Sequence, residues 1–282
     1  MSKNSGNRPG GQIPCEINKG EKELYQQNYK LRTYDCDKNK IAKPSGLLQE
    51  TQDCGEGQMA SEGQTYTDLF DQGKAFMLSR LDMHIKDELH YRDELTTRTW
   101  PCPSRRATFL RNYAMWKADN NEGKDNISVL VSTQWTLVGV EDRKLLTVDD
   151  VDMSCYTHDE YLEADFGKLK ISRDEEASMV CAEEHRVSYT DADLNGHMNN
   201  TYYVDYLCDQ IPELEHGTHR VSTVRIHFSK EAVVGDTIEI WMTPKMEPRE
   251  GADQECRYLF RTVRKSDGVM NIACEIGLVP VK

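Results

Sequence analysis

The chain has 282 residues, of which 38% are hydrophobic, so it is long enough for about two ordinary domains with real cores. Its 35 basic and 48 acidic side chains give a formal net charge of -13, which disfavours binding to nucleic acid and to anionic membranes. The sequence contains no run of about 18 apolar residues, so we expect no membrane span and a cytoplasmic protein.

Residues 1–18 are rich in Gly, Asn and Pro, and we expect them to form a flexible N-terminus. The nine cysteines are scattered and include no Cys-x-x-Cys pair, which indicates reduced thiols. Because no Cys/His cluster has the spacing of metal ligands, we expect no metal site and no organic cofactor.

The first half, residues 19–140, predicts one helix followed by a run of strands. Ser45 is a candidate N-cap for a helix that runs towards Met59. Gly55 and Gly57 weaken this helix, and close packing against a sheet would explain them. Aromatic and β-branched residues, broken by turn clusters, predict strands at 75–86, 95–100, 107–116 and 127–138.

Residues 141–184 are strongly acidic and only weakly periodic, so we interpret them as a linker with short helical pieces. The second half, residues 185–282, then repeats the order of the first, with a helix near 200–208 and strands at 221–228, 237–243, 256–264 and 270–279. One helix wrapped by an antiparallel sheet, twice over, predicts an α+β fold of two tandem hot-dog domains.

An internal repeat supports this duplication. The sequence Asp35-Cys-Asp37-Lys-Asn39 recurs as Asp191-Ala-Asp193-Leu-Asn195. Further along, His84 to Glu88 and Asp93 recur in the same order and spacing as His227 to Glu231 and Asp236. Each block alone is a weak signal, but two blocks in the same order indicate that one half is a copy of the other.

The densest polar cluster in the chain lies between Val187 and Tyr203, at a strand-to-helix junction. Taken singly, its Asp, Asn and His residues are ordinary turn and capping residues. Taken together they exceed what a turn needs, and Asn199 or Asn200 can cap a helix whose free N–H groups and positive dipole end could stabilise an oxyanion. The cluster therefore indicates a functional site.

This cluster reads Asp193-x-Asn195-x-His197-x-Asn199-Asn200 followed by Tyr, and it resembles the signature of the acyl-acyl carrier protein (ACP) thioesterases of plants and bacteria. Ser229 to Ala232 stands where that family has Arg-Arg-Glu-Cys or a similar sequence. Trp135 and the following Asp142-Arg143-Lys144 also resemble a family strand that ends in Trp and precedes a basic pair. The resemblance covers roughly residues 25–281.

The resemblance implies a catalytic set of Asp193, Asn195, His197 and Glu231. We expect Glu231 to act as the general base, Asn195 and His197 to orient the water or the thioester carbonyl, and Asp193 to hold this network or share the base role. Helix N–H groups near Asn200 would complete the oxyanion hole. Ala232 replaces the cysteine of the plant pattern, which excludes a thiol nucleophile at that position.

We expect one active site, in the second half, because the first-half counterparts of His197 and Asn200 are Ile41 and Pro44, which cannot do the same chemistry. The family resemblance implies that the acyl tail runs into the first half. The expected substrate-binding residues are the two asparagines of the cluster and three residues of the first-half helix: Asn199, Asn200, Leu48, Thr51 and Gln52.

The expected function is hydrolysis of a fatty acyl-ACP thioester to free fatty acid and ACP, which ends fatty acid synthesis. The acidic carrier would dock on a local basic patch, because charges are screened beyond about 8 Å at physiological salt. An acyl-CoA thioesterase and a catalytically inactive acyl-binding module remain alternatives, whereas the order of the cluster does not fit a hot-dog hydratase. The sequence leaves a homodimer open.

Overall fold

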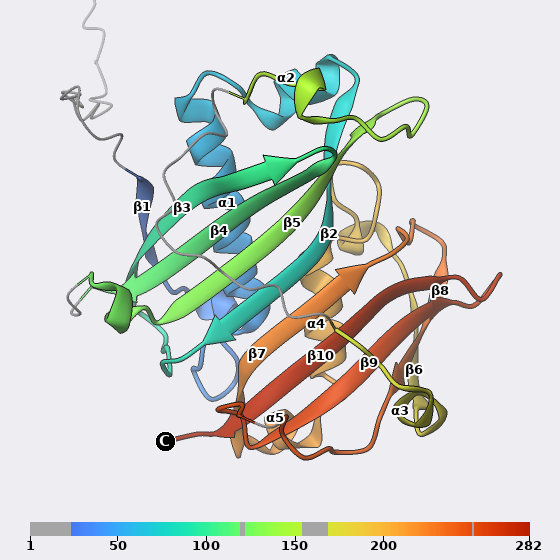
Figure 1. Cartoon of the computed structure of the whole chain (residues 1–282). Coiled ribbons are helices and arrows are strands. Elements are labelled where there is room, and N and C mark those ends of the chain that lie inside the picture. Colours follow the sequence, from blue (N-terminus) through green and yellow to red (C-terminus); the bar gives the residue numbers. More distant parts are fainter. Residues whose placement is uncertain (1–23, 119–121, 154–168, 250) are drawn as a thin grey trace, which may run out of the picture.

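The computed structural model describes residues 24–118, 122–153, 169–249 and 251–282. The expected N-terminal segment 1–18 and the centre of the acidic linker lie outside these residues. The described strands form one 10-stranded antiparallel sheet in the order β1-β3-β4-β5-β2-β7-β10-β9-β8-β6. Two helices, α1 and α4, cover one face of this sheet (Figure 1).

Each half of the chain contributes five neighbouring strands and one main helix. The first half comprises β1 (Tyr25–Lys30), α1 (Pro44–Ser61), α2 (Tyr66–Asp71), β2 (Lys74–Ile85), β3 (Glu94–Arg105), β4 (Thr108–Lys117) and β5 (Val129–Gly139). The second comprises β6 (Val180–Arg186), α4 (Asn200–Cys208), α5 (Pro212–His216), β7 (His219–Phe228), β8 (Thr237–Met242), β9 (Cys256–Arg264) and β10 (Met270–Pro280), with the short helix α3 (Arg173–Ala177) before it. The expected α+β double hot-dog architecture is confirmed.

The sequence repeat corresponds to a structural repeat. Short 3-10 turns at Thr33–Asp35 and Tyr189–Asp191 precede the two main helices at equivalent positions. An isolated bridge joins Ile41 to His90 in the first half, and its equivalent joins His197 to Val233 in the second. The two repeat blocks of each half therefore meet in space.

Within the sheet, the halves join where β2 pairs with β7. In this antiparallel pair Arg80 faces His227, and Asp82 faces Arg225. Asp82 and Arg225 are also equivalent positions of the repeat, so the approximate two-fold axis that relates the halves passes between them. Nε of Arg225 lies 2.9 Å from Oδ2 of the Asp82 carboxylate.

Helix α1 begins two residues earlier than expected, and Ser45 is not its cap. Lys43 occupies the N-cap position and Pro44 the first turn, where the missing N–H of proline costs nothing. The Ser45 hydroxyl instead donates to Asp205 of α4, 2.5 Å away, and so ties the two main helices together. Gly55 packs closely against the sheet, as expected, because a Cβ atom there would lie 2.8 Å from the Tyr113 hydroxyl on β4.

The two edge strands, β1 and β6, were not predicted. Both have mostly polar side chains, because an edge strand has only one neighbour and much of it faces solvent. The expected linker boundary at residue 184 is therefore wrong, since β6 begins at Val180. The division of the chain into two domains at residue 140 stays a prediction, because the strands of both halves form one continuous sheet that marks no boundary between domains.

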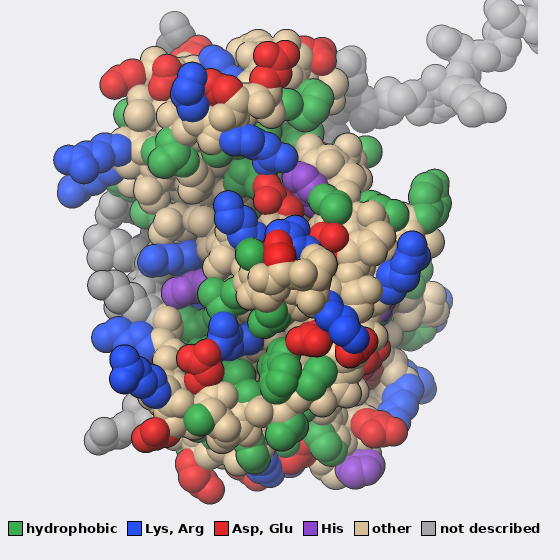
Figure 2. Space-filling model, turned by 90° about the vertical axis from the view of Figure 1, so that its right-hand side faces the viewer, with side chains coloured by type: hydrophobic (Ala, Val, Ile, Leu, Met, Phe, Trp, Pro, Cys, Tyr) green, Lys and Arg blue, Asp and Glu red, His purple; other side chains and the backbone are tan. Residues whose placement is uncertain are grey.

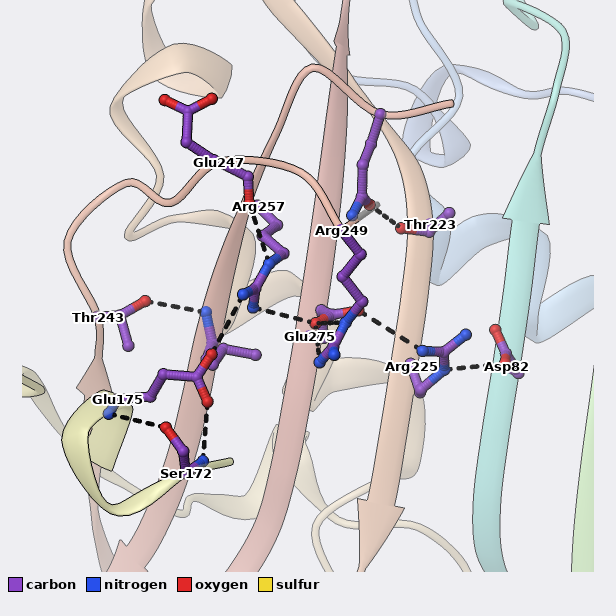
Figure 3. Close-up of polar contacts among 12 residues, drawn as sticks. Asp82, Ser172, Glu175, Thr223, Arg225, Thr243, Glu247, Arg249, Arg257 and Glu275 are labelled. Carbon is purple, nitrogen blue, oxygen red and sulfur yellow. Dashed lines mark hydrogen bonds and ion pairs between the residues drawn. The ribbon is translucent and has the colours of Figure 1, made fainter. Parts of the chain in front are cut away.

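A network of ion pairs runs across the sheet face opposite the main helices (Figure 3). From the junction between the halves, Arg225 reaches Glu275 on β10 at 3.6 Å. Arg257 on β9 continues the network, 3.3 Å from Glu275 and 3.1 Å from Glu175 of α3. Leu169 and Met179 pack nearby against Leu259. The end of the acidic segment is thus fastened to the sheet rather than solvated on all sides.

Acidic and basic side chains are mixed on the face of the molecule that Figure 2 presents, so the net negative charge does not form a single patch there. Among the described residues, none of the helices has both the length and the apolar character needed to span a membrane.

Candidate active site

The polar cluster forms a tight turn between a 3-10 turn and α4. Oδ1 of Asp193 accepts hydrogen bonds from the backbone N–H of Asn195 at 2.8 Å and of His197 at 3.2 Å. Gly196 adopts a φ of 75°, in the left-handed region that favours glycine. Asp193 therefore fixes the backbone that carries Asn195 and His197, while among the described residues no side chain or backbone group donates to its Oδ2.

The two consecutive asparagines have different roles. Asn199 caps α4, because its Oδ1 accepts a hydrogen bond from the backbone N–H of Thr201 at 2.9 Å. Asn200 is the first residue of the helix and lines the cavity described below. Its N–H is one of the helix-start donors without an intrahelical partner, so it is available to a ligand.

A residue from the other half completes the turn. The hydroxyl of Tyr66, the first residue of α2, donates a hydrogen bond of 2.7 Å to Oδ1 of Asn195. With Oδ1 engaged in this way, the Asn195 amide presents its N–H donors to the space beside it. Sequence reasoning missed Tyr66, because no signal in the chain connects it to a turn so far away.

Glu231 lies close to His197 and is paired with an arginine. Nη1 of Arg143 lies 2.9 Å from Oε1 of Glu231. Partial burial raises the pKa of Glu231, but the carboxylate's own backbone N–H, Arg143 and His197 outweigh it, so the net pKa is lowered. Glu231 is therefore a carboxylate at neutral pH. The basic pair after Trp135 had marked Arg143 in the sequence without indicating this partner.

A cavity of about 820 Å³ lies between the turn and the first half. From the turn, Asp193, Asn195, Asn199 and Asn200 line it, but His197 and Glu231 do not. From the first half its walls come from α1, α2 and strands β2 to β5: Gln52, Gly55, Glu56, Met59, Tyr66, Phe76, Pro101, Ser104, Phe109, Leu110, Arg111, Tyr113 and Trp135. A volume of this size is typical of a small-molecule site.

Of the three helix residues expected to bind the acyl chain, Gln52 lines this cavity. Leu48 and Thr51 instead border a narrow space of about 10 Å³ that shares Gln52, Tyr113 and Asn200 with the larger one. These two residues thus lie at the inner limit of the cavity rather than along its open part.

The first-half copy of the turn keeps the geometry but not the chemistry. Oδ1 of Asp37 accepts from the backbone N–H of Asn39 at 2.8 Å and of Ile41 at 2.9 Å, as Asp193 does in the second half. Gly217, at the end of α5, packs so tightly on Asn39 that a Cβ atom would lie 2.8 Å from its Nδ2. Helix α5 thus closes the space in front of Asn39, where α2 leaves the cavity open in front of Asn195.

No group of three or more His, Cys, Asp or Glu side chains is arranged to hold a metal ion in the part of the chain that the structure describes. The polar groups beside the turn include the Asp193 carboxylate, the amides of the asparagines, the Tyr66 hydroxyl and the N–H groups at the start of α4. Such a set can position a water molecule and stabilise an oxyanion.

Two family profiles match the chain. Residues 22–156 match the acyl-ACP thioesterase N-terminal domain, and residues 173–276 match the acyl-ACP thioesterase C-terminal domain. Among curated proteins, the chloroplastic palmitoyl-ACP thioesterase of Gossypium hirsutum is 20% identical over 253 residues, which cover 84% of this chain and 60% of the relative. The chloroplastic oleoyl-ACP thioesterase 1 of Arabidopsis thaliana is 21% identical and covers 79% and 64%. The chain thus spans about three fifths of the length of these relatives.

Solved structures share the fold. An acyl-ACP thioesterase from Bacteroides thetaiotaomicron superposes with a TM-score of 0.73 at 16% identity, over 90% of this chain and 97% of that one. The 12:0-ACP thioesterase from Umbellularia californica superposes with a TM-score of 0.75 at 14% identity, over 92% and 94% of the two chains.

Proposed function

Since the chain belongs to the acyl-ACP thioesterase family, we propose that it hydrolyses the thioester between a fatty acyl group and ACP, releasing free fatty acid and the carrier. One observation supports this proposal independently of the family. Residues of the first half form most of the cavity wall, and Asp193 and Asn195 of the turn also line the cavity. An acyl chain inside the first half would therefore bring its thioester to the polar cluster.

In the proposed mechanism Asp193 activates the attacking water, and Glu231 supports the turn. Asp193 faces the cavity with an unengaged Oδ2, so it is the carboxylate that contacts the attacking water and takes its proton. Glu231, an ionised carboxylate close to His197, and His197 itself lie outside the cavity walls, so in this scheme they position the turn that carries Asp193. The proton that Asp193 takes from water can then pass to the departing thiolate. The resemblance alone had pointed to Glu231 as the base, and the cavity walls favour Asp193.

The oxyanion would be held from two directions. The Asn195 amide, oriented by Tyr66, provides a side-chain N–H, and the N-terminus of α4 provides the backbone N–H of Asn200. Two donors aimed at one oxygen are the usual requirement for stabilising a tetrahedral intermediate, and each is worth about 10² to 10³ in rate. Tyr66 acts in this scheme as a positioning residue.

We propose that the carrier docks beside the β3–β4 turn. Arg105 and Arg106 are exposed there, next to Ser104 of the cavity wall, and neither has an ion-pair partner among the described residues. The carrier is acidic, so Arg105→Glu should raise the KM for acyl-ACP by about tenfold and slow its association. The matched control is Lys86→Glu, which makes an equal charge change on an exposed residue. Lys86 follows the last residue of β2, at the end of the sheet away from the β3–β4 turn.

The deciding experiment measures free thiol released from a panel of acyl-ACP and acyl-CoA substrates by the purified protein. We expect turnover on acyl-ACP with a higher kcat/KM than on acyl-CoA, and its loss in His197→Ala. Asn39→Ala, in the closed first-half turn, controls for folding. A preference for acyl-CoA would indicate the alternative thioesterase, and acyl binding without hydrolysis would indicate an inactive module.

We further propose the cytoplasm as the place of action, although the plant relatives are named chloroplastic. Fractionation of the source cells with an antibody against the chain tests this, and recovery from an organelle would contradict it.

A further inference from the structure

A buried aspartate, Asp191, closes the base of the turn that carries the candidate site. It is only 3% exposed and is the last residue of the 3-10 turn that leads into the polar cluster. Its backbone carbonyl accepts a hydrogen bond of 2.8 Å from the N–H of Asn199, the cap of α4. The position of Asp191 therefore determines where α4 begins, and with it where the N–H of Asn200 points.

The carboxylate of Asp191 joins three parts of the second half. Its Oδ2 accepts from the backbone N–H of Ser188 at 2.7 Å, and its Oδ1 accepts from the hydroxyl of Tyr206 on α4 at 2.7 Å. Nε2 of His185, on the edge strand β6, lies 2.9 Å from Oδ2. Because an ionised carboxylate only accepts, this nitrogen is the donor. Asp191 thus ties an edge strand and the main helix to the base of the turn.

The first-half copy has the same buried aspartate but lacks the tie to its helix. Asp35 is 1% exposed, and its Oδ2 accepts from the hydroxyl of Tyr29 on β1 at 2.5 Å. Tyr29 is the counterpart of His185 in the repeat. The counterpart of Tyr206 is Glu50, which accepts a hydrogen bond from β1. In the part of the chain that the structure describes, no side chain of α1 donates to Asp35, so the extra tie belongs to the half that holds the site.

This extra tie acts where the proposed chemistry is most sensitive to position. Tyr206 lies less than two helical turns after Asn200, on the same helix. A donor must stay within about 0.5 Å of its productive place to stabilise an oxyanion fully, so a small shift of α4 would weaken the contact from the N–H of Asn200. The rings of His185 and Tyr206 also pack together, with centroids 3.9 Å apart, so each donor supports the other.

We propose that His185 and Tyr206 are positioning residues for the hydrolysis. Through Asp191 they hold the start of α4 so that the N–H of Asn200 meets the oxyanion. Neither side chain lines the cavity, so both act without touching the substrate. This inference rests on the proposed thioesterase activity and deepens its mechanism.

The test measures kcat and KM for acyl-ACP separately, together with Tm, in variants of the two donors. Tyr206→Phe removes only the hydroxyl and should lower kcat about tenfold while KM stays within about twofold, because the contact that weakens is made in the transition state. His185→Leu should have the same effect. His185→Tyr should recover most of the lost rate, since Tyr29 makes the equivalent bond to Asp35 in the first half.

Tyr29→Phe is the matched control, because it deletes the equivalent hydroxyl from the equivalent buried aspartate. It should lower Tm but leave kcat within about twofold, which separates positioning from stability. A wild-type kcat in folded Tyr206→Phe would overturn the proposal, and so would an equal fall in Tyr29→Phe or a His185→Tyr no faster than His185→Leu. If His185→Leu does not fold, Tyr206→Phe decides alone. Absence of hydrolysis by the wild type on every thioester would refute the proposed function itself, an outcome distinct from an active wild type with unaffected variants.

Discussion

Tyr66→Phe removes a single hydroxyl oxygen and tests whether the first half positions the catalytic turn. The lost bond is the 2.7 Å contact to Oδ1 of Asn195. In stability, one such bond is worth about 1 kcal/mol. In catalysis the loss should be larger, because an Asn195 amide that can rotate no longer holds its N–H on the oxyanion, and a complete loss of one such donor costs about 10² to 10³ in kcat. We therefore expect kcat to fall about 10- to 100-fold.

The assay is steady-state release of free thiol from acyl-ACP, with kcat and KM determined separately. KM should change little, because the ring of Tyr66 stays in the cavity wall and only the transition-state contact weakens. Tyr258→Phe is the matched control, since it deletes a hydroxyl that donates to Glu213 at 2.8 Å. A wild-type kcat in Tyr66→Phe, a change confined to KM, or an equal fall in Tyr258→Phe would refute the positioning role.

Other variants test the remaining assignments. Glu231→Gln should lower kcat by at least about 10². Glu88→Gln, the same change at its first-half counterpart, should keep kcat within about twofold. The reverse result in folded proteins would place the chemistry in the first half. Because Arg143 lowers the pKa of Glu231, Arg143→Ala should raise that pKa and move the acid limb of the kcat/KM profile to higher pH; an unmoved limb would exclude Glu231 from catalysis. Burial raises the pKa of Asp191, but Ser188, Tyr206 and His185 outweigh it and lower the pKa to about 2. The ionised Asp191 carboxylate therefore stabilises the fold by an amount on the order of 2 kcal/mol above the unfolded pKa of about 4, and this stabilisation is lost as the pH falls towards 2. Denaturant unfolding should show that Asp191→Asn has a lower free energy of unfolding than the wild type at pH 7, and a much smaller difference at pH 2. Gln52→Trp should shorten the preferred acyl chain, and an unchanged chain-length profile would place the tail elsewhere.

Much of the fold could be predicted, because both halves obey the same local rules. Aromatic and β-branched residues between turn clusters predicted eight strands, and seven of them lie within two residues of their observed bounds. The helix expected near 200–208 also has those bounds, as α4 (Asn200–Cys208). The edge strands escaped because β1 and β6 lack that apolar signal. Ser45 was assigned to a cap because its type fits one, but its hydroxyl is engaged by Asp205, a partner that no local pattern reveals.

The candidate site, like the fold, has residues that the sequence predicted and residues that it did not. Asp193, Asn195 and Asn199 act on their own turn, and their spacing predicted them. Tyr66 reaches the site from the first half, and Arg143 reaches it from the segment that follows β5. Both do so through tertiary contacts, so their roles could not be read from spacing. The proposed site therefore combines side chains that lie far apart in the sequence.

The ion pair at the junction of β2 and β7 also determines which halves can associate. Asp82 and Arg225 lie on the approximate two-fold axis, where each faces its own equivalent. Two copies of the first half joined in this way would set carboxylate against carboxylate, and two copies of the second would set guanidinium against guanidinium. Opposite charges meet only when a first half joins a second half. The Asp82–Arg225 pair therefore favours the joining of a first half with a second half over the joining of two like halves. Two identical subunits related by this axis would place the same residue on both sides of it, so they could not form such an ion pair there.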